Sequence, residues 1–301
     1  MRIDQWRNYA QECLEKAGIE RSEARLELFI LIETCTGLNR SQQMIYPNRE
    51  LEPNQLKVLK TLLGRRCKRE PLAHLLGEWS FWGLEFIVSQ DTLIPRADTE
   101  VLVEEVLNFL DSAAYQKIAS KKHCLCDVGT GTGCIGLALA SERPKLNYHL
   151  LDISPKALAI AKKNALSLRN NQKIDQNTQI LFFESNLLQK YQNQLMMSPN
   201  IIVSNPPYVK RAVQETLMPE VKNFDPDLAL FDEAEDGLDI TRQLIVQASS
   251  LLPVNGALFI EVGYDQTILT KHILQEHGFN HVKIRHDYGG NPRVVSAIKY
   301  R

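Results

Sequence analysis

The chain has 301 residues, which is long for one domain and sufficient for two. Hydrophobic residues make up 44% of it and charged residues 24%, and the formal net charge is −1. This composition is typical of a globular protein and excludes a disordered or strongly basic nucleic-acid-binding chain.

Cysteine and histidine spacing bears on compartment and metal binding. The six cysteines include no C-x-x-C pair, and the seven histidines show no zinc-like spacing. No run reaches the ~18 apolar residues that a membrane span needs, and the N-terminus lacks the core of a signal peptide. We therefore expect a cytoplasmic protein with no metal site and no membrane partner. The basic run 65–69 is a local candidate for a partner contact, although the end of a solvated helix is the favoured interpretation.

The first 75 residues have the apolar spacing of helices. Three helices are expected, ending at or just before Gly18, Gly37 and Gly64. Aromatic and branched residues around Gly83, in the stretch 79–88, predict a strand pair or hairpin. We expect a helical domain at residues 1–75 and a β-hairpin linker at 76–95.

From residue 96 to 301, apolar strands alternate with amphipathic helices, which is typical of a doubly wound parallel sheet. Strands are predicted at 123–128, 148–152, 179–183, 200–204, 256–262, 281–286 and 294–300. Helices are predicted around 98–110, 134–141, 155–168, 238–251 and 266–277. The second domain is therefore expected to be of the α/β class.

Residues 124–136 run from an apolar strand into a glycine-rich turn and then a helix. Gly129, Gly131 and Gly133 let the backbone turn tightly and approach a ligand without collisions from Cβ atoms. Asp152 follows about 20 residues later, at the end of a second apolar run, where its carboxylate can accept hydrogen bonds from ribose hydroxyls. These features predict a site for an adenosine-containing cofactor.

The glycine loop alone leaves the identity of that cofactor open. Residues 131–136 also match the G-x-G-x-x-G fingerprint of nicotinamide dehydrogenases. Asp127 favours S-adenosylmethionine, because a carboxylate there would repel a pyrophosphate and attract the cationic amino-acid end of S-adenosylmethionine.

A second motif, Asn205-Pro-Pro-Tyr208, follows the apolar run 201–204. It should emerge at the carboxyl edge of the sheet, where open α/β sheets bind ligands. The Asn205 side chain and the Pro206 carbonyl can each accept one hydrogen of a planar –NH₂ group, with the Tyr208 ring beside it. The two prolines stiffen this turn, and positioning can supply much of the rate for a weakly nucleophilic amide. We therefore predict methyl transfer to an amide or amine nitrogen, with Asn205, Pro206 and Tyr208 as catalytic residues.

Further motifs extend over nearly the whole chain, namely Pro71-Leu-Ala-His-Leu-Leu-Gly77, Leu93-Ile-Pro-Arg-Ala-Asp-Thr-Glu100 and Asp287-Tyr-Gly-Gly-Asn-Pro-Arg293. With the glycine loop and the Asn-Pro-Pro-Tyr turn, they make the chain resemble the release-factor glutamine methyltransferases of the HemK type. The resemblance implies a Rossmann-like, seven-stranded class I methyltransferase sheet with a reversed last strand. A small all-helical domain would precede it, joined by the hairpin.

The resemblance also implies a substrate and a cofactor. The methyl donor would be S-adenosyl-L-methionine, which becomes S-adenosyl-L-homocysteine. The acceptor would be the glutamine of the Gly-Gly-Gln motif in class 1 peptide-chain release factors, so that the reaction modulates translation termination. The helical domain would recognise the release factor, and no direct nucleic-acid substrate is expected.

The motifs and the resemblance together place the site residues. The cofactor contacts are expected at Asp127, Gly129, Thr130, Gly131, Thr132, Gly133, Asp152, Asn186, Leu187 and Asn205. The substrate contacts are expected at Arg96, Asn205, Pro206, Pro207 and Tyr208. Two departures from the family pattern are the absence of an acidic residue at 185–187 and Ala97 in place of a second proline.

Three other functions are compatible with parts of this pattern. An adenine- or guanine-amino methyltransferase acting on DNA or RNA uses the same turn on a flipped base, but the near-neutral charge argues against it. A glutamine methyltransferase acting on a ribosomal protein is a second alternative. A cofactor-binding partner protein without turnover is a third, and the intact Asn-Pro-Pro-Tyr motif argues against it.

Overall fold

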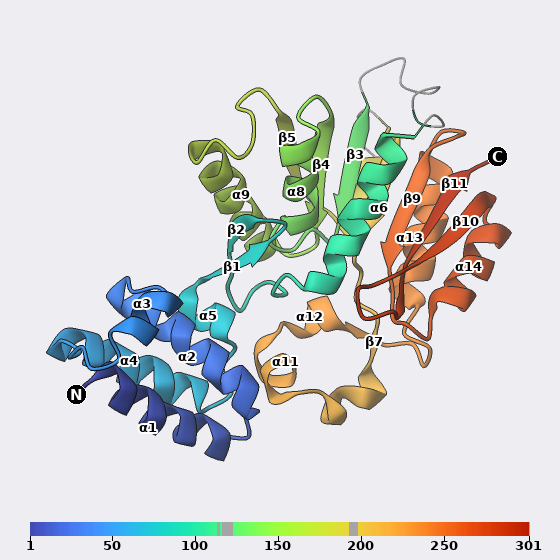
Figure 1. Ribbon diagram of the computed structural model, residues 1–301. Coiled ribbons are helices and arrows are strands. Elements are labelled where there is room, and N and C mark those ends of the chain that lie inside the picture. The colour runs from blue at the N-terminus through green and yellow to red at the C-terminus, as the bar shows by residue number, and fades with distance from the viewer. Residues whose placement is uncertain (113–114, 116–122, 193–197, 301) are drawn as a thin grey trace. The chain divides into compact units, whose positions relative to one another are not determined.

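The computed structural model describes residues 1–112, 115, 123–192 and 198–300 (Figure 1). The chain divides into two compact units. The helical unit contains Met1–Gly77 and Met218–Phe224. The sheet unit contains Glu78–Leu217 and Asp225–Arg301. Residues 218–224 thus group with the N-terminal helices, whereas the sequence expectation assigned them to the second domain.

The helical unit is built from amphipathic helices whose apolar faces bury residues such as Trp6, Leu28 and Leu63. Its helices are α1 (Ile3–Lys16), α2 (Arg21–Thr36), α3 (Arg40–Ile45), α4 (Pro53–Arg66), α5 (Leu72–Leu76) and α11 (Pro219–Phe224). Gly37 adopts a left-handed conformation that ends α2 as predicted. The prediction that α4 ends at Gly64 was wrong, because the helix continues through Gly64 to Arg66.

The basic run 65–69 is engaged within the helical unit. The buried Arg66 side chain is 1% exposed and forms ion pairs with Glu27 at 2.8 Å and with Glu220 at 2.7 Å. Arg69 pairs with Glu220 as well, and Arg65 pairs with Glu70. These arginines therefore neutralise acidic residues of the same unit, and the run does not form an open basic patch.

The sheet unit contains a seven-stranded sheet in the order β10-β11-β9-β6-β3-β4-β5 (Figure 1). Its strands are β3 (Cys124–Val128), β4 (Asn147–Asp152), β5 (Gln179–Glu184), β6 (Ile201–Ser204), β9 (Ala257–Glu261), β10 (Phe279–His286) and β11 (Pro292–Lys299). The pairs among β5, β4, β3, β6 and β9 are parallel, and β11 runs antiparallel to both β9 and β10. The predicted seven-stranded sheet with a reversed last strand is confirmed.

Helices cover both faces of this sheet, as α/β proteins with parallel strands require. They are α6 (Glu100–Leu110), α8 (Cys134–Glu142), α9 (Pro155–Asn170), α13 (Asp239–Leu251) and α14 (Thr267–Glu276). Alternate residues of each strand enter different cores. Ile201, Val203 and Phe259 pack with α6 and α8, whereas Ile202 and Leu258 pack with α13 and α14.

The hairpin of β1 (Glu78–Phe81) and β2 (Leu84–Ile87) turns at Trp82 and Gly83, which both have positive φ angles, 54° and 66°. Two successive positive φ angles are typical of a type I′ hairpin turn. Asn164 of α9 exchanges hydrogen bonds with the backbone of Ile87. The hairpin that was expected as a linker is therefore attached to the sheet unit.

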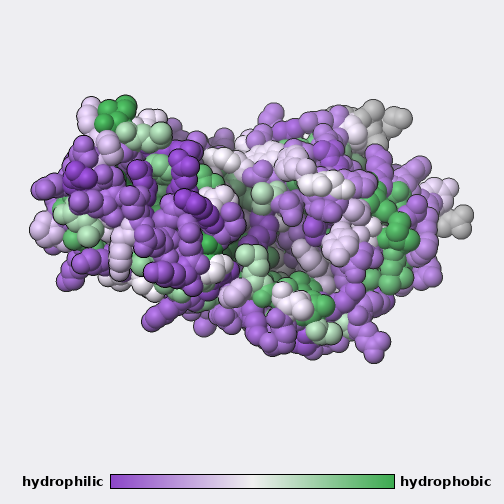
Figure 2. Space-filling model, turned by 60° about the horizontal axis from the view of Figure 1, so that its bottom comes forward, coloured by the Kyte–Doolittle hydropathy of each residue, from purple (hydrophilic) through white to green (hydrophobic). Residues whose placement is uncertain are grey.

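The remaining elements are short and were not predicted. They are η1 (Ala97–Thr99), α10 (Gln189–Gln192), β7 (Val209–Lys210), η2 (Arg211–Thr216), α12 (Asp227–Leu230) and β8 (Phe231–Asp232). None of the helices among the described residues is long and apolar enough to cross a membrane. Figure 2 shows one face of the molecule, on which hydrophilic residues predominate and hydrophobic residues form separate clusters.

Candidate active site

The glycine loop connects β3 to α8 and depends on a residue without a side chain at Gly133. This residue has a φ of 83°, and a Cβ atom there would lie 2.9 Å from Leu137 Cδ1. The amide of Gly131 donates a hydrogen bond to Asp152 Oδ2 at 2.8 Å, which joins the loop to the end of β4. The loop is therefore held open beside the carboxyl edge of the sheet.

Asp127 lies beneath this loop and is fully buried. Its Oδ2 atom accepts hydrogen bonds from the Thr130 hydroxyl at 2.6 Å and from the Gly136 amide at 3.0 Å. Burial raises the pKa of Asp127 to about 6 despite these two hydrogen bonds. The carboxylate thus supports the loop from below, and its Oδ1 atom has no hydrogen-bond partner among the described residues.

Asp152 ends β4 at the edge of the cavity. Its Oδ1 atom accepts a hydrogen bond from the Ser154 amide at 2.9 Å, while Oδ2 accepts from Gly131. Burial raises the pKa of this carboxyl above its ordinary value, and the backbone amides partly offset that effect. Each carboxylate oxygen has a second lone pair, so Asp152 can still accept hydrogen bonds from two ligand hydroxyls.

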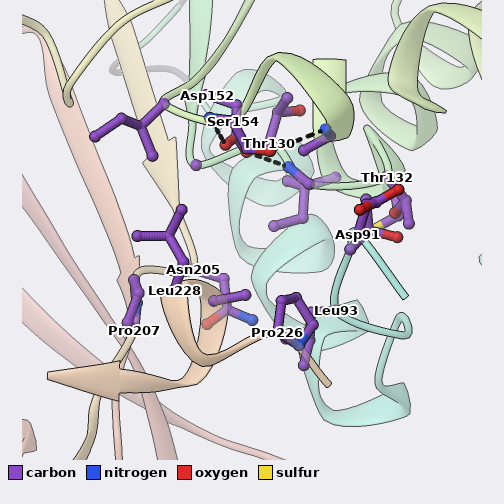
Figure 3. Close-up of a pocket in the computed structure, with 18 of the residues that line it drawn as sticks. Asp91, Leu93, Thr130, Thr132, Asp152, Ser154, Asn205, Pro207, Pro226 and Leu228 are labelled. Atoms are coloured by element: carbon purple, nitrogen blue, oxygen red, sulfur yellow. Dashed lines mark hydrogen bonds between the residues drawn. The ribbon is translucent and has the colours of Figure 1, made fainter. Parts of the chain in front are cut away.

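One cavity of about 290 Å³ joins the glycine loop, Asp152 and the Asn-Pro-Pro-Tyr turn within the sheet unit. Of the predicted site residues, it is lined by Arg96, Gly129, Thr130, Gly131, Thr132, Asp152, Asn186, Leu187, Asn205 and Pro207. Figure 3 shows Asp152, Ser154 and Thr130 at one side of the cavity and Asn205, Pro207, Pro226 and Leu228 at the other. Four predicted residues do not line it, namely Asp127, Gly133, Pro206 and Tyr208.

The turn after β6 is fixed at both ends. The Ser204 hydroxyl donates to the Val128 carbonyl at 2.7 Å, and the Tyr208 carbonyl accepts a hydrogen bond from Gln266 at 3.1 Å. Between these anchors, Asn205 Nδ2 donates to Thr99 Oγ1 at 3.3 Å. Burial raises the pKa of Tyr208, so its phenol stays neutral near the site.

Several residues that support the site escaped the sequence analysis. Gln266 is buried, and besides binding the Tyr208 carbonyl it accepts a hydrogen bond from the Gly263 amide at 2.8 Å. Asp225, also buried and not predicted, accepts a hydrogen bond at 2.6 Å from the predicted residue Arg96, and this pair fixes the segment before α12. Glu261 ends the apolar strand β9 in the same way as Asp152 ends β4, and that pattern could have found it.

The cavity fits an S-adenosyl ligand. Leu93, Ile153, Leu187 and Leu228 provide apolar walls against which a purine can pack. Asp152 lines the same cavity and offers carboxylate acceptors for ribose hydroxyls. The described residues contain no group of three or more His, Cys, Asp or Glu side chains that could hold a metal ion.

Asp152→Ala is expected to weaken binding of S-adenosylmethionine by about 2 kcal/mol, because two ribose hydroxyls lose a charged acceptor. Isothermal titration calorimetry measures this difference. The matched control is Asp111→Ala, which removes a surface carboxylate that pairs only with the partly exposed Arg143 in the described structure. Equal affinities in wild type and Asp152→Ala would contradict the placement of the ribose.

Comparisons with known proteins agree with this geometry. The family model of the PrmC N-terminal domain matches residues 5–77, and that of the methyltransferase small domain matches residues 105–221. A release factor glutamine methyltransferase of Geobacter sulfurreducens is 35% identical, over 94% of this chain and 92% of its own length. One of Agrobacterium fabrum is also 35% identical, over 95% and 94%.

Among solved structures, the hMettl16 catalytic domain in complex with a 3′UTR hairpin has a TM-score of 0.53. It is 15% identical in sequence, and the match covers 83% of each chain, so it supports the fold alone. The extent and identity of the matches to the bacterial enzymes carry more weight. By these relatives, the chain belongs to the family of release factor glutamine methyltransferases.

Proposed function

We propose that this enzyme transfers the methyl group of S-adenosylmethionine to the side-chain amide nitrogen of the glutamine in the Gly-Gly-Gln motif of class 1 release factors. The observation that supports it best is the single cavity shared by the glycine loop, Asp152 and Asn205. Its relatives are named for the same chemistry on release factors. An amino-methyltransferase acting on nucleic acid is not favoured, because those relatives carry the protein-glutamine name.

S-adenosylmethionine supplies the methyl group when it is bound. Asn205 Oδ1 and the Pro206 carbonyl accept the two hydrogens of the substrate amide and hold its nitrogen in position. Arg96 and Pro207 line the same cavity and are proposed to contact the substrate chain. An amide nitrogen is a weak nucleophile, so this orientation is expected to supply much of the rate.

The test of this function uses labelled S-adenosylmethionine and a panel of possible acceptors. The panel contains a class 1 release factor, ribosomal proteins, total tRNA, ribosomal RNA and duplex DNA. We expect label only on the release factor, and mass spectrometry should place it on the glutamine of Gly-Gly-Gln. Label on a nucleic acid or on a ribosomal protein, with none on the release factor, would overturn the proposal.

We further propose that the helical unit recognises the release factor. We also propose that the reaction takes place in the cytoplasm, where release factors act on ribosomes. The unit contributes no residue to the cavity lining. It carries exposed apolar side chains at the end of α3, namely Met44, Ile45 and Tyr46. Apolar side chains on a surface are a feature of protein contact sites.

Ile45→Glu is therefore expected to raise the KM for an intact release factor by about tenfold, corresponding to the loss of ~1.4 kcal/mol of binding free energy. The KM for a short peptide containing Gly-Gly-Gln should not change, because such a peptide lacks the parts of the release factor that we expect to contact α3. Leu166→Glu on α9 is the matched control, since Leu166 is 61% exposed and Ile45 is 67% exposed. If both variants keep the wild-type KM, α3 has no part in recognition.

A further inference from the structure

Glu261 is a buried carboxylate next to the Asn205 turn, and none of the roles described above involves it. It is the last residue of β9, is 2% exposed and does not line the cavity. The Tyr208 hydroxyl donates to its Oε1 atom over a long 3.5 Å, and Oε2 has no hydrogen-bond partner among the described residues. A buried carboxylate with a weak partner costs free energy, so its presence at an active site points to a function.

The register of the sheet brings Glu261 next to Asn205. Strands β6 and β9 are parallel neighbours, with Ser204 opposite Ile260. Asn205 is one residue beyond Ser204, and Glu261 is one residue beyond Ile260. Side chains at matched positions of neighbouring strands point to the same face, so both side chains lie on the face that α6 covers. Thr99, the N-cap residue of α6, contacts Asn205 from that face.

The orientation of the Asn205 amide decides whether this residue can hold the substrate. A substrate –NH₂ group needs an acceptor, so Oδ1 must face the cavity and Nδ2 must face the protein. Thr99 does not determine this orientation, because a hydroxyl can either donate or accept. A carboxylate can only accept, and both the Asn205 amide and the Thr99 hydroxyl lie close enough to stabilise the charged form of Glu261.

We propose that Glu261 is a positioning residue that selects the orientation of the Asn205 amide in which Oδ1 faces the substrate nitrogen. The carboxylate attracts Nδ2 and repels Oδ1, so the opposite orientation is disfavoured before the substrate arrives. This proposal rests on the proposed function, because it takes an amide nitrogen as the methyl acceptor. Glu261 acts through Asn205 and does not itself touch the substrate.

The proposal predicts a dependence on pH. Burial raises the pKa of Glu261 to about 7. The other charged and titratable groups that face it are Asp98, Cys134, Tyr208 and Arg293. Above this pKa the carboxylate accepts from Nδ2. Below it, the neutral carboxyl group can donate a hydrogen bond to Asn205 Oδ1. This turns Asn205 Nδ2 toward the cavity, where it faces the substrate –NH₂ group. Both groups are then hydrogen-bond donors, so the substrate nitrogen is no longer held.

The first test follows the side-chain amide of Asn205 by NMR in the full-length protein, with its signals assigned by their loss in Asn205→Ala. In the wild type, we expect these signals to shift with a midpoint near pH 7, as the Glu261 proton is lost. In Glu261→Gln, which keeps the shape of the side chain, the shift should disappear. Asn205 signals that do not titrate in the wild type, or that titrate equally in both proteins, would overturn the proposal.

The second test measures single-turnover methyl transfer to the release factor. The wild-type rate should fall about tenfold between pH 8 and pH 6, as a group with a pKa near 7 becomes protonated. Glu261→Gln should be about tenfold slower at pH 8, since a misplaced acceptor lowers the rate, and it should lack the pH dependence. Affinity for S-adenosylmethionine should be equal in both proteins.

The matched control is Glu104→Gln, which removes a carboxylate of α6 that pairs with Arg285 away from the cavity. It should keep the wild-type rate and pH profile. A Glu261→Gln enzyme with wild-type rate and profile would overturn the positioning role even if the proposed function stands. If the wild type methylates no release factor, the proposed function fails, and the NMR titration still decides whether Glu261 orients Asn205.

Discussion

Asn205→Ala is expected to lower kcat by about 10²-fold or more, comparable to the loss of one preorganised polar group in other active sites. The variant loses the side-chain acceptor that holds the substrate amide. It keeps the fold, because the turn remains anchored by the hydrogen bonds from Ser204 to Val128 and from Gln266 to Tyr208. Steady-state methyl transfer to the release factor measures the effect, and thermal unfolding checks the fold.

The control for this variant is Asn170→Ala, at an exposed position at the end of α9. It should retain wild-type kcat and KM. Turnover of Asn205→Ala close to that of the wild type would contradict the central role of this residue. Loss of binding of S-adenosylmethionine, with kcat preserved at saturation, would make Asn205 a cofactor contact with no part in catalysis.

Asn205→Asp extends this prediction, since it keeps an acceptor of similar shape. It also places a second carboxyl group beside the buried Glu261. Two neighbouring carboxyl groups raise the pKa of one member of the pair, so one of them should hold a proton near neutral pH. We expect activity between that of the wild type and that of Asn205→Ala.

Arg66→Ala is expected to destabilise the helical unit by about 3–5 kcal/mol, because removing one partner leaves buried charge uncompensated. The side chain is 1% exposed and pairs with Glu27 and Glu220, which are 9% and 12% exposed. Urea denaturation gives the free energy of unfolding. Hydrogen exchange in peptides from α2 and α4 shows whether the loss lies in this unit.

Two further variants separate the charge from the packing. Arg65→Ala removes a neighbouring arginine that pairs with Glu70 and whose side chain is 43% exposed. This change should lower the free energy of unfolding by less than about 1 kcal/mol. Combining Arg66→Met with Glu27→Leu should be less destabilising than Arg66→Met alone, because no carboxylate is left unpaired at position 27. If the double variant loses as much free energy of unfolding as the two single variants together, packing and not charge stabilises this cluster.

Local patterns in the sequence were sufficient to predict most of the strands and helices of the sheet unit. Each of the seven predicted strands is present within a few residues of its expected ends. Apolar runs bounded by turn residues indicate such strands directly, because both faces of a central parallel strand are buried. The glycine loop and Asp152 could likewise be placed at one edge, since all parallel strands of such a sheet end there.

The short elements were missed for a physical reason. Helices α3 and α5 have 6 and 5 residues, which is too few for a period of 3.6 to be recognised. The strand β7 and the helix α12 are shorter still, with 2 and 4 residues. Such segments are stabilised by contacts with the rest of the fold and not by their own pattern.

The sequence by itself determined the α/β class, the order of the main elements, the family and the motifs around the cofactor, because period, glycine spacing and chain order are local properties. Only the tertiary structure decided which charged groups meet. Arg66 binds Glu220 across 154 positions, and Arg96 binds Asp225 across 129. Glu261 lies beside Asn205 only because β6 and β9 pair in one register. A shift of that register by a single residue would turn one of these side chains to the opposite face. The local pattern of β6 or of β9 alone does not specify this register.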